Sequence, residues 1–149
     1  MKRLLTILLL MFSVGVGAET MEDLVIRDGI YYKQFTDVPF TGKITGTKQG
    51  AIRNGKKHGP WVRYHENGQL WDKGNYKDDK PDGPWIVYYT TGQLMKKENY
   101  KDDKREGTRV VYFPNGQLME KENYKDGKLD GPYVSYTEYG QLTVEQTFK

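Results

Sequence analysis

The 149-residue sequence contains no cysteine, and serine and histidine occur only twice each, as Ser13, Ser135, His58 and His65. Without cysteine the chain has no disulfides, no thiolate metal ligands, no lipid-carrying cysteine and no cysteine nucleophile. With so few hydroxyl nucleophiles and imidazole bases, most enzyme mechanisms lack the side chains that they need. The composition therefore predicts a protein that is not an enzyme and holds no cofactor.

Residues 1–18 are predicted to be a secretory signal peptide and not part of the fold. Two basic residues precede an apolar run over residues 4–12, and Ala18 is the small residue of a cleavage site before Glu19. The apolar run falls short of the roughly 20 residues that span a bilayer. We therefore expect cleavage after Ala18, a secreted or periplasmic location and no stable membrane span. Retention of the segment as an N-terminal anchor is the alternative.

Charge gives little reason to expect a nucleic-acid or lipid ligand. The chain has 23 lysines and arginines against 20 acids, and the predicted cleavage removes Lys2 and Arg3, which lowers the net charge from +3 to +1. Lysines and acids alternate along the chain, whereas nucleic-acid-binding proteins cluster basic residues. A net charge near zero also attracts anionic lipids weakly. The sequence thus predicts no nucleic-acid partner and ranks lipid binding low.

A 24-residue repeat organises the chain from Gly59 onward. Self-similarity of this length indicates one supersecondary unit stacked on the next, with capping segments at the ends. The predicted domains are a signal peptide at 1–18, an N-terminal β cap at 19–41 and repeats at 42–149. The repeats divide into a degenerate unit at 42–58 and further units at 59–82, 83–106, 107–130 and 131–149.

Each unit is predicted to contain two strands and two turns. Trp61–His65 is rich in aromatic and β-branched residues and ends at the hairpin signal Asn67-Gly68. The second strand, Gln69–Tyr76, ends in Lys-Asp-Asp-Lys, whose acids favour a turn. In the cap, Leu24–Arg27 and Ile30–Lys33 flank Asp28-Gly29, another hairpin signal. The predicted fold class is all-β, an elongated antiparallel meander of β-hairpin repeats that forms a single-layer twisted sheet.

The period-2 alternation of strands assigns side chains to two faces. Val62 and Tyr64 have Val, Ile or Tyr at the equivalent positions of every later unit, and this uniform side is predicted to be the packed face. Trp61 lies on the opposite side, where the equivalent residues differ between units. On the second strand, Leu70 and Tyr76 are predicted to share a face unless a β-bulge changes the parity.

The repeated pattern Gly-Pro-Trp-x-x-Tyr-x-x-x-Gly-Gln-Leu, followed by Asn-Tyr-Lys-Asp-Gly-Lys and the next Gly, resembles the bacterial MORN-variant repeat over about residues 42–149. The resemblance implies an elongated twisted sheet of β-hairpins. Some proteins of this family are labelled antitoxins of toxin–antitoxin systems, others are secreted or envelope proteins, and eukaryotic relatives serve as scaffolds. The resemblance implies a fold and not a reaction, because function belongs to sites and not to folds.

Three features that suggest chemistry have simpler explanations. The pair Asp78-Asp79 is flanked by lysines and recurs at turns, whereas a calcium loop needs converging oxygens without competing ammonium groups. His58 and His65 lie on a turn and a strand without the further ligands of a metal site. Ser135 lies in mid-strand, without the strand–turn–helix elbow of a hydrolase. We therefore predict no catalytic residue and no metal site.

The variable aromatic face carries the one pattern that predicts a function. Aromatic side chains bring large contact areas and a polar handle to interfaces. A single-layer sheet cannot bury both faces, so a partner for one of them is expected. The alternative is that the rings pack the concave side of a curled sheet. The candidate partner-binding residues are Trp61, Trp85, Tyr89, Arg109, Phe113 and Tyr133.

These observations predict a non-enzymatic, exported repeat protein that acts as an interaction module or scaffold for an unidentified protein partner. The resemblance adds a narrower expectation, an antitoxin-like role. The alternative is a module that binds cell-wall glycan or a membrane surface.

Overall fold

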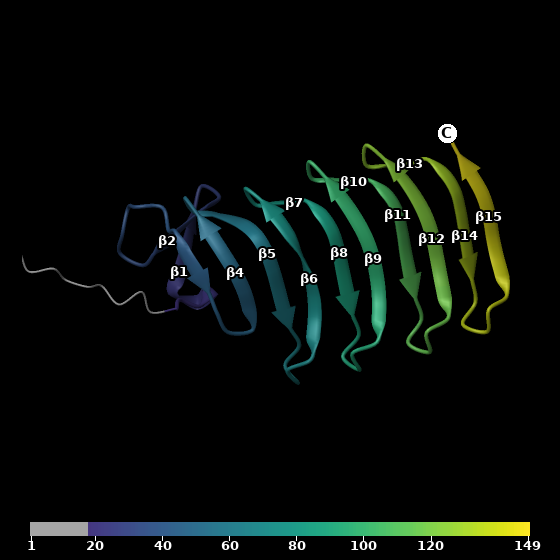
Figure 1. The fold of residues 1–149 in the computed structure, drawn as a ribbon, viewed down its shortest axis with the longest axis horizontal. Helices are drawn as coiled ribbons and strands as arrows, with labels where there is room; N and C mark the ends of the chain where they lie inside the picture. The colour runs from purple at the N-terminus through teal and green to yellow at the C-terminus, as the bar shows by residue number, and fades with distance from the viewer. Residues whose placement is uncertain (1–17) are drawn as a thin grey trace, which may run out of the picture.

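The computed structural model describes residues 18–149, and nearly all of their regular structure is antiparallel β-sheet (Figure 1). One sheet has 13 strands, and its main path runs in the order β15-β14-β12-β11-β9-β8-β6-β5-β4-β3. The short strands β7, β10 and β13 pair only with β6, β9 and β12. Strands that follow one another in sequence thus lie side by side, which confirms the predicted hairpin meander.

The elements of the N-terminal part are η1 (Met21–Asp23), β1 (Leu24–Arg27), β2 (Ile30–Lys33), β3 (Gly42–Ile44) and β4 (Lys48–Arg53). The elements that follow are β5 (Lys56–Tyr64), β6 (Leu70–Lys77), β7 (Lys80–Pro81), β8 (Gly83–Tyr88), β9 (Leu94–Lys101), β10 (Lys104–Arg105), β11 (Gly107–Tyr112), β12 (Leu118–Lys125), β13 (Lys128–Leu129), β14 (Gly131–Tyr136) and β15 (Leu142–Phe148).

The strands β1 and β2 form a separate two-stranded hairpin around Asp28-Gly29, with the bounds that the sequence predicts. This hairpin and the segment after it supply Leu24 and Phe40 to a buried cluster at the N-terminal end of the large sheet. The sheet contributes three buried side chains to the same cluster: Ile44, Ile52 and Trp61. The β1–β2 hairpin therefore covers one end of one face of the sheet.

The glycine that opens each repeat unit has a left-handed backbone conformation. Gly83 follows β7 with a φ of 84°, and the equivalent Gly107 and Gly131 have φ values of 77° and 98°. At this point the chain leaves its pairing with β6 and resumes it further along, with Asp82 N–H donating to the Asn75 carbonyl at 3.0 Å. Only glycine adopts such a φ without a Cβ clash, which explains why it recurs every 24 residues.

A β-bulge follows the first turn of each unit and changes the parity of the second strand. Arg63 pairs with Asp72, but its neighbour Tyr64 pairs with Leu70, so Trp71 is the extra residue. The same register shift occurs in the three later hairpins. Leu70 therefore shares a face with Tyr64, and Tyr76 lies on the other face. The prediction that Leu70 and Tyr76 share a face is wrong, because the bulge intervenes.

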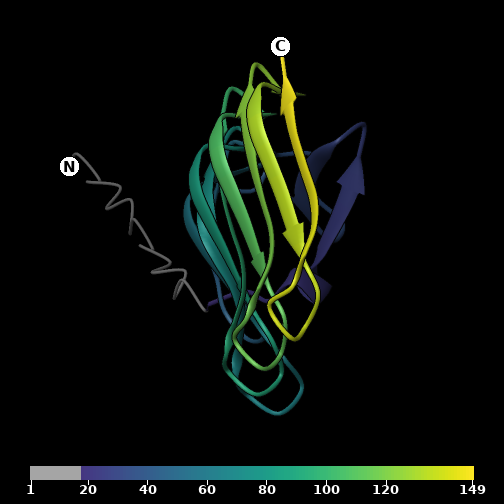
Figure 2. The same cartoon turned by 90° about the vertical axis from the view of Figure 1, so that its right-hand side faces the viewer.

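The strands bend toward the side on which the β1–β2 hairpin lies (Figure 2). We call this side, which carries Trp61, Asp72 and their equivalents, the concave face. The opposite side, which carries Val62, Tyr64 and their equivalents, is the convex face. The buried side chains of the repeat units are on the concave face: Trp61, Asp72, Trp85, Val87, Glu98, Val111 and Glu122.

The prediction that the Val62 and Tyr64 side would be the packed face is therefore wrong. Both residues are only half-buried, whereas Trp61 is 4% exposed. Curvature brings the concave side chains of neighbouring strands together, and the β1–β2 hairpin covers the first of them. Burial on this side thus depends on contacts between strands and with the cap.

Candidate functional site

The candidate site is a row of side chains that crosses the concave face at the middle of the strands. The register places Trp61 opposite Gly74, Trp85 opposite Glu98, Arg109 opposite Glu122 and Tyr133 opposite Gln146. Four of the six residues predicted from the sequence belong to this row: Trp61, Trp85, Arg109 and Tyr133.

In the first two units each tryptophan lies against a glycine of the preceding strand. A Cβ added to Gly74 would lie 1.9 Å from Cε3 of Trp85, and one added to Gly50 would lie 2.3 Å from Cδ2 of Trp61. The ring of Tyr76 packs edge-on between the two indoles, with ring centres 6.1 Å from Trp61 and 5.2 Å from Trp85. Trp61 and Trp85 therefore pack the concave side, which is the alternative that the sequence left open.

In the third unit an ion-pair network replaces the glycine–tryptophan contact. Glu98 stands where Gly74 stands one unit earlier, and Arg109 stands where Trp85 stands. The buried Glu98 carboxylate lies 2.5 Å from Nζ of Lys96 and 3.1 Å from Nε of Arg105. Arg109 lies 2.7 Å from Oε2 of Glu122, which faces it within the same unit. Buried charges need such partners, because an isolated one is expensive to desolvate.

The cations of this network favour the charged form of Glu98. Burial alone would raise the pKa of Glu98, but the hydrogen bond and charge of Lys96, together with the charge of Arg105, hold it below its usual value. Tyr124 donates a hydrogen bond from its hydroxyl to Oε2 of Glu122 at 2.9 Å, and burial raises the pKa of that phenol. Glu98 is therefore a carboxylate near neutral pH, which suits charge pairing better than proton transfer.

The other two predicted residues lie beyond the ends of their strands. Tyr89 follows β8 and donates its hydroxyl to the Tyr112 carbonyl at 2.7 Å, which links two neighbouring units. Phe113 occupies the same place after β11 and is half-buried. At the far end of the row, Tyr133 packs edge-on against Phe148, with ring centres 6.3 Å apart.

The structure adds charged residues to this face that the sequence analysis did not single out. Asp72 is 2% exposed and accepts hydrogen bonds from Nε of Arg63 at 2.9 and 3.0 Å. Lys57 holds its ammonium group 5.0 Å from the ring centre of Tyr76. A signal was present in the repeat itself, because the change from Gly74 to Glu98 accompanies the change at the facing position one strand later.

The acids, histidine and serine considered in the sequence analysis lie in turns or form local contacts. Asp78 and Asp79 have φ values of 50° and 67° and form the tip of the turn between β6 and β7. His58 lies 3.6 Å from Asp78, and Oγ of Ser135 lies 2.7 Å from the Thr143 hydroxyl. Within residues 18–149, no group of three or more histidine and acidic side chains is arranged to hold a metal ion. The same part of the chain contains no helix of the length and apolarity needed to cross a membrane.

The three hairpins β5–β6, β8–β9 and β11–β12 have the same register and follow one another at intervals of 24 residues. Three consecutive units match the MORN repeat variant. The matched residues are 57–78, 81–102 and 105–126, which lie in the central part of the sheet. The MORN repeat is a non-catalytic module that generally serves interaction with proteins or membranes.

A comparison with curated protein sequences gives no match. Among solved structures, the chain is similar to one in the crystal structure of a GtfA/B complex bound to UDP and GlcNAc, with a TM-score of 0.26 and 12% sequence identity. The similarity covers 91% of this chain and 29% of that chain, so this chain spans less than a third of that protein's length.

Proposed function

We propose that this protein is an exported interaction module that holds a protein partner along the concave face of its sheet. The observation that carries the proposal is the partial cover of that face. The β1–β2 hairpin packs on the concave side only at the N-terminal end, around Trp61. Over β11, β12 and β14 no other element of residues 18–149 covers this side. A partner segment has room there to occupy the place that the hairpin takes at the other end.

The side chains along the uncovered part suit an interface. Phe113 and Tyr133 are half-buried rings, and Arg109 and Glu120 form an ion pair at 3.2 Å beside them. Interface centres combine aromatic and arginine side chains in this manner. The residues on this face differ between units, whereas Tyr64 and its equivalents on the convex face are all tyrosine. Variation along a repeat gives a surface that distinguishes one partner from another.

The test is a pair of matched variants used as baits in an envelope extract. Phe113→Ala with Tyr133→Ala removes two rings from the concave face, and Tyr112→Ala with Tyr136→Ala removes two rings from the convex face of the same strands. We expect a specific partner to be retained by the wild-type protein and the convex-face variant and lost by the concave-face variant. Equal retention by both variants, or no partner at all, would contradict the proposal. Thermal melting of each bait shows that it is folded.

Export is the second part of the proposal, and it is supported by the order of basic, apolar and small residues over 1–18. The mass of the protein recovered from cells tests it, because cleavage after Ala18 leaves a chain that begins at Glu19. Recovery of the uncleaved chain from the cytoplasm would contradict export.

The narrower antitoxin-like role is supported only by the family resemblance. It requires a neighbouring gene whose toxic product is neutralised when the two are co-expressed.

One observation favours an acidic cell-wall glycan as a second candidate ligand, on the convex face. Lys73, Lys97 and Lys121 occupy one row, in which each lysine pairs with a valine or isoleucine of the next strand. Successive lysines are two strands apart, or about 10 Å. None of the three forms an ion pair within residues 18–149. Evenly spaced free cations beside a row of tyrosines match a linear polymer with regularly spaced negative charges.

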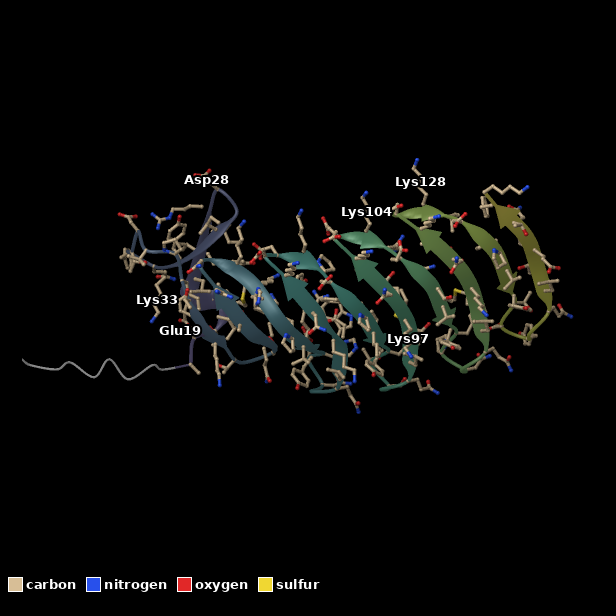
Figure 3. All side chains as sticks on the ribbon, turned by 45° about the horizontal axis from the view of Figure 1, so that its top comes forward. Glu19, Asp28, Lys33, Lys97, Lys104 and Lys128 are labelled. Carbon is tan, nitrogen blue, oxygen red and sulfur yellow. The ribbon has the colours of Figure 1, made fainter. Side chains whose placement is uncertain are left out.

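Sedimentation with insoluble peptidoglycan tests this second candidate. Reversing the charge of the row with Lys97→Glu and Lys121→Glu should leave the protein in the supernatant. The matched control is Lys104→Glu with Lys128→Glu, at two exposed lysines on the turn edge of the sheet (Figure 3). Wild-type protein that stays wholly in the supernatant, or equal loss of binding in both variants, would exclude the glycan.

A further inference from the structure

A small cavity lies between the N-terminal cap and the concave face, with a volume of about 140 Å³. The sheet lines it with the aromatic rings of Trp61, Tyr76 and Trp85, and the cap contributes Met21 and Tyr31. An apolar cavity of about 150 Å³ accepts a benzene ring. The aromatic part of the wall therefore offers contacts to one flat or branched apolar group of about that size, and charged side chains line the rest.

Two of the four charged side chains that line the cavity, Arg63 and Asp72, neutralise one another. Arg63 donates from Nε to both oxygens of Asp72, at 2.9 and 3.0 Å, and from Nη2 to Oδ2. This arginine–carboxylate pair is bidentate and pairs the two charges. The same guanidinium lies 4.2 Å from the ring centre of Trp71. Arg63 is thus held by Asp72 and Trp71 and is not the group that remains available to a ligand.

Two lysines of the cavity have no such partner. The ammonium group of Lys57 lies 5.0 Å from the ring centre of Tyr76, 5.4 Å from that of Trp61 and 6.0 Å from that of Tyr31. Within residues 18–149, neither Lys57 nor the exposed Lys48 lies within ion-pair distance of a carboxylate. Aromatic faces attract an ammonium group but do not accept its hydrogen bonds as a carboxylate does. Both lysines therefore retain donors for an anion.

Burial also bears on the pKa of Lys57. Desolvation lowers the pKa of Lys57, Asp79 partly offsets this effect, and the charges of Arg63 and Lys48 add to it. A bound anion would relieve both the desolvation and the repulsion between the cations. The excess of positive charge is modest, because Asp72 also lines the cavity and disfavours a ligand with several negative charges.

We propose that this cavity binds a small monocarboxylate with an aromatic or compact apolar body. The carboxylate accepts hydrogen bonds from Lys57 and Lys48, and the body packs against Trp85 and Tyr76. Nothing in this assignment depends on the uncovered part of the concave face, because the cavity lies under the cap at the other end. The proposed small-molecule site is therefore separate from the proposed partner surface, and each is tested by its own experiment.

The experiment titrates the purified full-length protein with benzoate and follows tryptophan fluorescence and thermal melting. Benzyl alcohol, of the same size but neutral, and inorganic phosphate, charged but without an apolar body, are the matched ligands. We expect saturable quenching and a melting temperature that rises with benzoate concentration, since the ligand binds only the folded state. Benzyl alcohol and phosphate should bind at least about tenfold more weakly. Equal affinities for benzoate and benzyl alcohol would overturn the proposal.

Two variants assign the site to the lysines. Lys48→Gln changes an exposed residue at the mouth, so the protein stays folded, and we expect benzoate affinity to fall several-fold. Lys57→Gln should lower it by about tenfold or more. Lys97→Gln, on the convex face, is the control and should bind benzoate as the wild type does. If Lys48→Gln and Lys97→Gln bind equally well, the carboxylate does not reach this cavity and the proposal fails.

Discussion

Gly74 and Trp85 show how the residue on one strand determines which side chain fits on the neighbouring strand. Wherever the second strand of a unit has glycine, as at Gly50 and Gly74, the following strand places a tryptophan across it. Where that strand has Glu98, the following strand has Arg109 instead. In these three pairs the two positions change together because the side chain on one strand fills the space above the other. Glu122 is followed by Tyr133, so the row changes from ring packing to charge pairing at Glu98 and Arg109 and ends in a ring at Tyr133.

This coupling predicts the effect of exchanging the pair. Gly74→Ala should lower the free energy of unfolding by about 1–3 kcal/mol, because its Cβ would overlap the indole of Trp85. Gly74→Glu and Trp85→Arg should each be strongly destabilising alone and should partly rescue one another in the double variant. Urea denaturation of the four proteins forms a double-mutant cycle. Asn75→Ala, on the convex face beside Gly74, is the control and should change stability little. Strictly additive effects would contradict the coupling.

Glu98 gives the protein a predicted sensitivity to acid. Its pKa is lowered in the folded state from the ordinary value of 4.5, so below that value the unfolded state binds more protons. The stabilisation from Glu98 is therefore fully present above pH 4.5 and is lost as the pH falls through the lowered pKa. Glu98→Gln should cost roughly 3 kcal/mol near neutral pH, because it leaves cations without their partner.

Urea denaturation between pH 7 and pH 3 measures this effect. The difference in stability between wild type and Glu98→Gln should shrink as the pH falls below 4.5. Glu66→Gln, at an exposed glutamate on a turn, is the matched control and should follow the wild-type curve. Parallel curves for wild type and Glu98→Gln would show that the network does not lower the pKa of Glu98.

At the scale of elements, the first turn of two units is tied to the first turn of the next unit by an asparagine. Asn67 donates from Nδ2 to the Thr90 carbonyl at 2.9 Å and accepts from Gln69 N–H at 3.0 Å. Asn115 repeats both bonds with Glu138 and Gln117, at the same two distances. Thr91 occupies this position in the unit between them and bonds only to the side chain of Gln93. One link in the row of turns is therefore missing.

Thr91→Asn should restore that link and stabilise the protein. The new side chain would donate to the carbonyl of residue 114, as Asn67 and Asn115 do at the same spacing. We expect a gain of about 1 kcal/mol and a melting temperature higher by about 4 °C, measured by circular dichroism. Thr90→Asn, at the adjacent exposed position, is the control and should have little effect. A variant no more stable than this control would contradict the bridging role.

At the scale of the whole molecule, the apolar core is concentrated at one end. Leu24, Phe40, Ile44, Ile52 and Trp61 form the buried cluster, and Ile44 and Ile52 are the largest fully buried side chains within residues 18–149. Toward β15 the strands rely on cross-strand pairs and half-buried rings. In repeat architectures, stability is approximately a sum of unit and interface terms, so it need not be uniform along the sheet.

Two phenylalanines of the cap region test the role of the cluster. Phe40 is 7% exposed and Phe35 is fully exposed. Phe40→Ala should lower the free energy of unfolding by about 3–5 kcal/mol, because it removes a buried ring and leaves a cavity. Phe35→Ala should change it by less than about 0.5 kcal/mol. Chemical denaturation of both variants measures the difference, and similar values would mean that the cap does not stabilise the sheet.

Amide hydrogen exchange should show the same asymmetry without any substitution. We expect the slowest exchange in β4, β5 and β6, beneath the cap, and faster exchange in β14 and β15. Mass spectrometry of peptic fragments measures the protection of each unit. Uniform protection from β4 to β15 would indicate that the sheet opens as one cooperative body, and it would contradict a core concentrated at the N-terminal end.

Much of this architecture follows from local pattern. The 24-residue period predicts the meander, and Asp28-Gly29 predicts the β1–β2 hairpin with the correct bounds. The alternation of a strand and the residues of a turn depend on neighbours in sequence, so both can be predicted without a structure. The sequence left a β-bulge in the second strand open as an alternative but did not place it at Trp71, because the residue pattern of the strand does not show where pairing is interrupted. Its consequence was a reversal of the face assigned to Leu70.

The assignment of the faces required the three-dimensional structure. Alternation separates Trp61 from Val62, but it does not say which of them is covered. That choice depends on the direction in which the sheet bends and on the side where the cap packs, and both bring together residues that are distant in sequence, such as Tyr31 and Trp61. The same long-range contacts enclose the cavity around Lys57. The local spacing of residues thus determined the order of strands and turns. The curvature of the sheet and the packing of the cap determined which face is buried and where the cavity lies, because both depend on contacts between residues distant in sequence.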